Sequence, residues 1–186
     1  LPPPDQLPIE IRRKNFGNTY QRLHRDKPAT TMVPGNNAFP IHPVKHRSLT
    51  PREAARIQTF PDRHKFSGTR AQQCIQVGNA VPPLLAEKIA NKIKEYLKSN
   101  DFGGRQQSRE KLPVIDDVRN HNYNGLNCVD LFSGIGGFAI GFENSGFEVL
   151  VACDNDTFVE ESHKKNLPHI PFICGDLSLS ETRDKI

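Results

Sequence analysis

A glycine-rich turn between two apolar runs constrains this 186-residue chain more than any other feature. The run Leu126–Phe132 is typical of a buried strand, and it stops at Gly134, Gly136 and Gly137 before the helix-like run Phe138–Phe142. A strand that turns through glycines into a helix N-terminus is where α/β sheets bind cofactors, because glycine lets the backbone approach the ligand. The turn therefore predicts an α/β fold with a ligand site at the carboxyl edge of its sheet.

The segments that follow residue 125 alternate between strand and helix patterns. We expect strands at 126–132, 147–153 and 171–174, helices at 138–145 and 156–166, and a polar tail to residue 186. Alternation at this spacing predicts parallel strands joined by right-handed crossovers. Since three strands are too few for a stable doubly wound sheet, we expect a partial α/β domain.

Two helices are predicted in the first half of the chain. Thr50, Pro51 and Glu53 supply a cap, a proline for the first helical position and a capping-box acid, so a helix is expected from there to about Thr59. A second helix is expected at 83–98, after a loop at 76–83 in which Gly78 and Asn79 suit a tight turn with positive φ. Its large apolar side chains recur at helical spacing and predict a core-facing side, made of Leu84, Leu85, Ile89, Ile93 and Leu97.

The composition narrows the class of protein. The formal net charge is +4, with basic residues dense between Arg12 and Arg70, which permits a nucleic-acid partner although a solvated basic face explains it as well. The four cysteines have no close metal-ligand spacing, so we expect no metal site and a reduced, cytoplasmic protein. The sequence shows neither a signal peptide nor an apolar run of membrane-spanning length, and no membrane partner is expected.

Two acidic residues follow the next two predicted strands. Asp154 lies where an acid accepts hydrogen bonds from the ribose hydroxyls of a nucleoside cofactor, and Asp176 could accept from an adenine amino group. Each acid alone is more often a turn or capping residue, but three strand-end features in register favour an adenosine-containing ligand. The glycine spacing does not match the dinucleotide fingerprint, which makes a methyl donor the better interpretation.

The stretch Asp130–Phe138 resembles the first motif of DNA (cytosine-5) methyltransferases, which use S-adenosyl-L-methionine, and Asp154 and Asp176 fall on the second and third motifs. The resemblance implies a Rossmann-like methyltransferase fold that is partial and permuted. It implies that Phe132 stacks near the adenine, that the turn amides and Gly134 cradle the amino-acid moiety, and that Asp154 and Asp176 hold the ribose and the adenine amino group. Asp130 and Gly136 belong to the same expected cofactor-binding set. Asp154 stands where the family usually has Glu, which shortens its reach by one methylene.

The first half resembles the same family. The stretch Arg47–Asp62 is similar to the ninth motif, and Gln76–Pro83 is similar to the tenth, with Asn79 the implied cofactor contact. Tyr20–Met32 resembles the segment that leaves the target-recognition domain. The resemblance implies a double-stranded DNA substrate and a place in restriction-modification.

The chain departs from the family in two ways. The ninth and tenth motifs precede the first, which is a permuted order. The Pro-Cys motif that supplies the nucleophile and the Glu-Asn-Val motif that supplies an acid are both missing, since no cysteine here follows a proline. We therefore expect no catalytic residue in this chain and no activity of the chain alone.

These expectations define four regions. We assign 1–45 to the end of the target-recognition region, 46–98 to the ninth and tenth motifs, 99–124 to a linker and 125–186 to the cofactor half. The missing initiator Met and the abrupt end favour a fragment of a longer permuted enzyme. Two alternatives stay open: a subunit of a split methyltransferase that needs a partner, and a non-catalytic nucleotide- or DNA-binding module.

Overall fold

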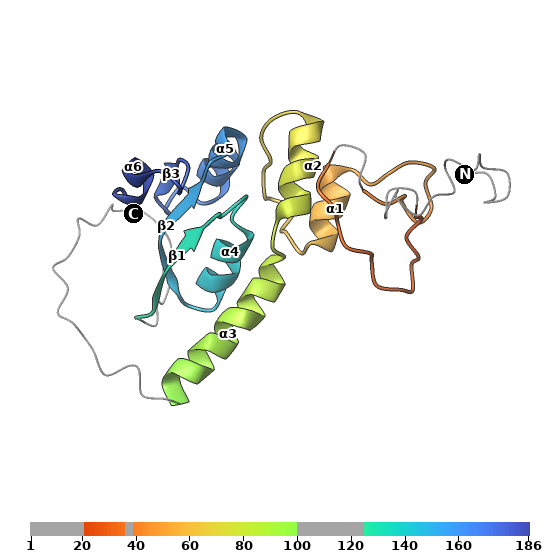
Figure 1. Cartoon of the computed structure of the whole chain (residues 1–186). Helices are drawn as coiled ribbons and strands as arrows, with labels where there is room; N and C mark the ends of the chain where they lie inside the picture. The colour runs from red at the N-terminus through yellow and green to blue at the C-terminus, as the bar shows by residue number, and fades with distance from the viewer. Residues whose placement is uncertain (1–20, 36–38, 100–124) are drawn as a thin grey trace. The chain divides into compact units, whose positions relative to one another are not determined.

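The computed structural model describes residues 21–35, 39–99 and 125–186, and it divides into two compact units, Leu1–Ala80 and Val81–Ile186 (Figure 1). Each unit is described by itself. Of the linker predicted at 99–124 only Ser99 is described, and residues 1–20 and 36–38 of the recognition region predicted at 1–45 lie outside the described residues. Among the helices of the described ranges, none is both long enough and apolar enough to cross a membrane.

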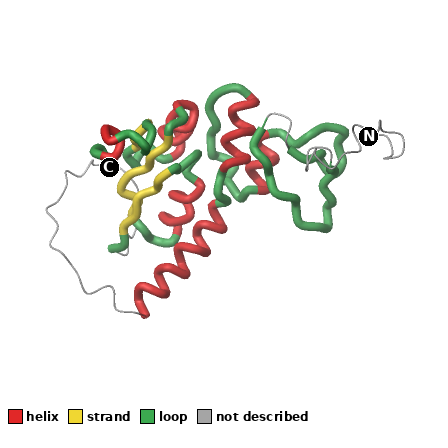
Figure 2. The backbone as a smooth tube through the Cα atoms, in the orientation of Figure 1, coloured by secondary structure: helices red, strands yellow, loops and turns green. Residues whose placement is uncertain are grey.

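The second unit contains a three-stranded parallel sheet, as the alternating pattern predicted (Figure 2). Asp130 pairs with Ala152 and Asp154 with Cys174, so the carboxyl ends of all three strands lie at one edge. The strands, in their order across the sheet, are β1 (Asn127–Leu131), β2 (Glu148–Asp154) and β3 (Phe172–Cys174). All three predicted strands are confirmed to within a residue or two.

Helices connect and follow these strands. The predicted helices at 138–145 and 156–166 are confirmed as α4 (Gly137–Asn144) and α5 (Thr157–Asn166). The interpretation of 175–186 as a polar tail is wrong in part, because it contains a short helix, α6 (Ser180–Arg183). Four residues are too few to carry an apolar period, so no sequence pattern marks this helix.

The predicted second helix is confirmed as α3 (Pro83–Ser99), but its predicted core side is wrong. The buried residues that α3 turns toward α4 are the small Ala86 and Ala90, whereas Leu85 and Ile89 are 50% and 40% exposed. A Cβ added at Gly141 of α4 would lie 2.5 Å from the Ala86 Cβ, so the two helices approach more closely than large side chains allow. The small residues therefore form the contact, and the apolar set predicted for the core faces outward or is only partly buried: Leu84, Leu85, Ile89, Ile93 and Leu97.

The first unit holds α1 (Pro51–Ile57) and α2 (Arg70–Asn79). The capping box predicted for α1 is confirmed: the Glu53 backbone N–H donates to Thr50 Oγ1 at 3.2 Å, and the Thr50 N–H donates to Glu53 Oε2 at 2.8 Å. Ala54 and Ala55 of α1 are fully buried.

The loop predicted at 76–83 is wrong for residues 76–79, which complete α2. A second capping box, between Thr69 and Gln72, starts this helix seven residues before the predicted loop. Gly78 does not adopt the expected positive φ. It is a helical residue whose added Cβ would clash with the backbone of Pro34, so close packing rather than turn geometry requires glycine there.

Candidate functional site

The turn after β1 has an unusual backbone. Phe132, Gly134 and Gly136 have φ values of 57°, 51° and 81°, in the left-handed region that a non-glycine residue such as Phe132 rarely adopts. The Phe132 side chain is 77% exposed, so burial does not hold it in this conformation. Gly136 is the N-cap of α4 and gives that helix no side-chain cap. Since the Ala139 N–H bonds to Asp130, the amides at the start of α4 that remain to interact with an anionic group are those of Gly137 and Phe138.

Asp154, at the end of β2, is bonded to this turn. Its Oδ2 accepts the Gly134 N–H at 2.9 Å, and its Oδ1 accepts the Asp156 N–H at 3.2 Å. A carboxylate offers about four lone-pair sites, so these two bonds leave it able to accept from a ligand hydroxyl. The structure brings Gly134 and Asp154 together, as their predicted places at one sheet edge require.

Asp176 lies exposed just after β3. The preceding Gly175 donates its N–H to the Asp154 carbonyl oxygen at 2.9 Å, which ties the two strand ends together. Asp176 Oδ1 accepts the Ser178 N–H at 2.8 Å, and bonds from Ser178 lower the pKa of this carboxyl. Asp176 thus shapes the turn that leads to α6.

Asp130 is the buried member of the set. Burial is the main reason that its pKa rises to about 6, and the negative charge of Asp154 raises it further, whereas the Ala139 N–H lowers it. Its Oδ2 has no hydrogen-bond partner within the described residues. Asp130 thus links β1 to the first turn of α4, where its bond from the Ala139 N–H orients the helix start.

His163 of α5 and Leu167, the C-cap of that helix, support the turn, and sequence reasoning missed both. A Cβ added at Gly136 would come within 2.5 Å of Leu167 Cδ1 and 3.7 Å of His163 Nδ1. Both side chains are buried, and burial is the main reason that the pKa of His163 falls to about 4, so the ring is neutral at pH 7. No motif in the sequence marks His163, because its place under the turn depends on the packing of α5.

Asn79 lies exposed at the end of α2, in the first unit, whereas the other predicted site residues belong to the second. Its contact with a ligand at the glycine turn stays a prediction.

Comparisons with known proteins find one matching family model and several similar type II methyltransferases. A model of the C-5 cytosine-specific DNA methylases matches residues 9–95 and 126–186. The type II methyltransferase M.AquIB of Picosynechococcus is 44% identical over 95 residues, which cover 45% of this chain and 68% of that protein. M.AgeI of Thalassovita gelatinovora is 43% identical over 84 residues, and M.DdeI of Desulfomicrobium norvegicum is 39% identical over 97. This chain spans only 20% and 23% of the lengths of these last two proteins.

Proposed function

Because the chain belongs to the C-5 cytosine-specific DNA methylase family, we propose that it supplies the S-adenosyl-L-methionine site of a DNA (cytosine-5) methyltransferase. The observation that carries the proposal is the hydrogen bond between the Gly134 N–H and Asp154 Oδ2. This bond joins a left-handed glycine turn to an acid at the carboxyl edge of a parallel sheet, where α/β proteins bind nucleosides.

The residues around the turn fit this cofactor. The Gly134 and Gly136 amides already donate to Asp154 Oδ2 and to the Ser133 carbonyl, so it is the uncapped start of α4 that suits a carboxylate. The unused lone pairs of Asp154 suit ribose hydroxyls. The exposed ring of Phe132 offers a face for the adenine, and Asp176 offers an acceptor for its amino group. When bound, S-adenosyl-L-methionine supplies the methyl group. The part proposed for this chain is to bind it and to hold its orientation, with Asp130 and Gly136 shaping the turn and Asn79 a further contact.

We propose that the nucleophile comes from other residues, either of a longer chain or of a second subunit. The four cysteines here are poor candidates, because burial raises the pKa of each thiol, to about 11 for Cys128, and disfavours the reactive thiolate. A chain without this nucleophile is expected to be inactive on double-stranded DNA by itself.

The exposed side of the sheet is a further reason to expect another piece of protein. β1 is an edge strand of the sheet in the described part of the chain, and its alternate residues Val129 and Leu131 are 42% and 46% exposed. Parallel sheets in soluble proteins are covered on both faces, so further polypeptide is expected to pack there.

The order of the motifs is proposed to be permuted. The match to the family falls on two separate segments, 9–95 and 126–186, and the residues proposed to bind the methyl donor, apart from Asn79, fall within the second. On this proposal the four regions keep the roles expected from the sequence: the end of a target-recognition region at 1–45, the ninth and tenth motifs at 46–98, a linker at 99–124 and the cofactor half at 125–186.

One observation favours the split-subunit alternative. The aligned region takes 45% of this chain but 68% of M.AquIB, so M.AquIB is the shorter protein of the two. If this chain is a natural subunit, its relatives are expected to include proteins of similar or shorter length. In that case, addition of a partner that carries the Pro-Cys motif should restore methyl transfer.

Calorimetry with S-adenosyl-L-methionine tests the cofactor assignment. We expect the chain to bind it and Asp154→Ala to weaken binding at least tenfold, because the ribose loses its acceptor and the turn loses a tether. Asp184→Ala, which removes an exposed acid at the end of α6, serves as the matched control. Wild-type affinity in Asp154→Ala would refute the ribose assignment. Methyl incorporation into DNA by the purified chain alone would refute the claim that the nucleophile lies elsewhere.

A further inference from the structure

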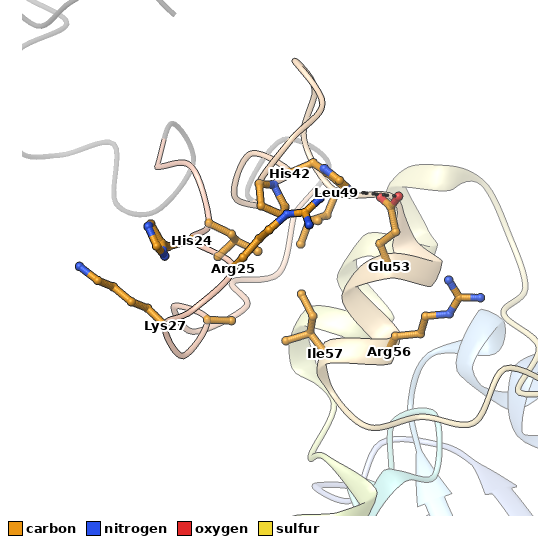
Figure 3. A pocket seen from close by; sticks show the side chains of 11 residues that line it. His24, Arg25, Lys27, His42, Leu49, Glu53, Arg56 and Ile57 are labelled. Atoms are coloured by element: carbon orange, nitrogen blue, oxygen red, sulfur yellow. Dashed lines mark ion pairs between the residues drawn. The ribbon is translucent and has the colours of Figure 1, made fainter.

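The first unit contains a hollow of about 320 Å³ that the donor site does not use (Figure 3). Three segments form it: the stretch around residues 23–29, the stretch around 42–49, and one side of α1. Its floor is apolar and includes Leu23 and Leu49, which are buried, and Ile57. Its rim carries basic and histidine side chains, namely His24, Arg25, Lys27, His42 and Arg56.

Backbone bonds hold these segments in place. The Leu23 N–H donates to the Ile41 carbonyl at 2.9 Å, and the Leu49 N–H donates to the Pro40 carbonyl at 3.0 Å. The Arg22 guanidinium donates to the carbonyls of His42 and Lys45 at 2.6 and 3.0 Å, which fixes the intervening loop. Backbone hydrogen bonds within the unit therefore fix the segments that line the hollow.

The acid that lines the hollow is already neutralised. Arg47 donates to both carboxylate oxygens of Glu53, each at 2.7 Å, and the Thr50 N–H donates to Oε2. These bonds, led by the one from Arg47, hold the pKa of Glu53 far below its ordinary value. Glu53 therefore stays ionised and paired, and it has little remaining charge with which to repel an anion.

His42 has a defined tautomer. The backbone N–H groups of Val44 and Lys45 donate to its Nδ1 at 3.1 and 3.0 Å, so Nδ1 is an acceptor and the proton is on Nε2. Nε2 lies 3.8 Å from Glu53 Oε1. His42 thus presents its Nε2–H beside Glu53 at the edge of the hollow.

Two cations of the rim are left without an acidic partner in the described part of the chain. Arg56 is paired with Asp62 through Nε and Nη2, at 2.7 and 3.1 Å. Arg25 and Lys27 form no such ion pair in the described ranges, and both are exposed. In Figure 3 the Arg25 side chain reaches toward His42, while Lys27 extends outward from its loop. The lining therefore carries a net positive charge over an apolar floor.

We propose that this hollow binds a phosphodiester of the DNA backbone, with Arg25 and Lys27 as its cationic contacts. The apolar floor suits the carbon face of a deoxyribose, and the cationic rim suits the adjoining phosphate. Such a contact positions DNA without reading its sequence. The proposal rests on the proposed function, because a DNA substrate follows from the family, but it concerns a surface separate from the glycine turn.

The test is the salt dependence of DNA binding by the full 186-residue chain, followed by the anisotropy of a short fluorescein-labelled duplex. Between about 50 and 200 mM salt, Arg25→Gln and Lys27→Gln should each reduce the slope of log K against log salt by about 1. Arg63→Gln and Lys88→Gln, which remove exposed cations outside the hollow, are matched controls and should leave the slope near that of the wild type. Ala29→Trp, which fills the hollow at constant charge, should weaken binding several-fold.

Each other result counts against the proposal. Slopes that fall equally in the four charge variants, no effect of Ala29→Trp, or no measurable binding at the lowest salt would each overturn it. If polyglutamate displaces the labelled duplex as readily as unlabelled duplex does, the ligand of the hollow is an acidic peptide. If inorganic phosphate displaces it as readily, the ligand is a free anion. Calorimetry with S-adenosyl-L-methionine on the Arg25→Gln variant separates the cofactor proposal from the DNA proposal. If this variant binds the cofactor as the wild type does and its salt slope for DNA is also unchanged, the DNA-binding role of the hollow is refuted and the cofactor site is not.

Discussion

A methyl group added at Gly136 should destabilise this protein for two separable reasons. Its φ of 81° lies in the left-handed region, which costs an L-residue roughly 1–2 kcal/mol. An alanine Cβ there would also lie 2.5 Å from Leu167 Cδ1, on a side chain that is buried in the core. Overpacking of a core typically costs about 1–3 kcal/mol, so Gly136→Ala should destabilise the second unit by roughly 2–5 kcal/mol. That is a large part of the roughly 5–15 kcal/mol that stabilises an ordinary domain.

Gly134→Ala is the matched control, because Gly134 also has a positive φ, of 51°, but an added Cβ would meet nothing within 4 Å. It should therefore cost only the backbone strain, roughly 1–2 kcal/mol. Urea unfolding followed by far-ultraviolet circular dichroism gives both values. In a chain that already carries Leu167→Ala, the Gly136→Ala change no longer meets the leucine side chain. There it should cost only the backbone strain, which is less than it costs in the wild type. Equal destabilisation by the two glycine variants, or an equal cost of Gly136→Ala with and without Leu167→Ala, would refute the role of Leu167.

Two further predictions concern pH. The paired Glu53 has a lowered pKa, so its contribution to stability is present above about pH 4.3, its unfolded value, and is lost as the pH falls toward the folded value. Glu53→Gln should cost the first unit about 1–2 kcal/mol at pH 7 and flatten this acid dependence in urea titrations, whereas an unchanged acid limb would contradict the pairing. Asp130 has a raised pKa of about 6, so the folded state binds its proton more tightly and stability should rise as the pH falls from about 7 to about 4. Asp130→Asn should remove that rise, which is worth roughly 2–3 kcal/mol, and a rise that persists in the variant would show that another group causes it.

Local signals were sufficient for most helices and strands. The Thr50–Glu53 capping box and the apolar runs before and after the glycine turn depend on neighbours in sequence, and the elements that they predicted are present. Helix α2 was not predicted, and its last residues were assigned to a loop because Gly78 and Asn79 are typical of a turn. Only the approach of Pro34 explains why glycine is needed inside this helix.

The buried side of α3 shows the limit of periodicity. A period of 3.6 identifies a helix, but it does not say which side is buried, because that depends on the surface opposite. Here the opposite surface is Gly141 of α4, which selects Ala86 and Ala90 and leaves Leu85 and Ile89 exposed.

The amino-acid sequence by itself determined the local features of the candidate site: a glycine turn after one strand and acids after the next two, at one edge of a parallel sheet. Those features follow from short stretches whose backbone geometry is local. Only the tertiary structure decided that Asp154 bonds to the Gly134 amide, that Asp130 is buried with a raised pKa, and that His163 and Leu167 support Gly136. It alone also assembled the basic hollow of the first unit. The physical reason is that burial, electrostatic environment and close approach depend on residues distant in the chain, which no local pattern records.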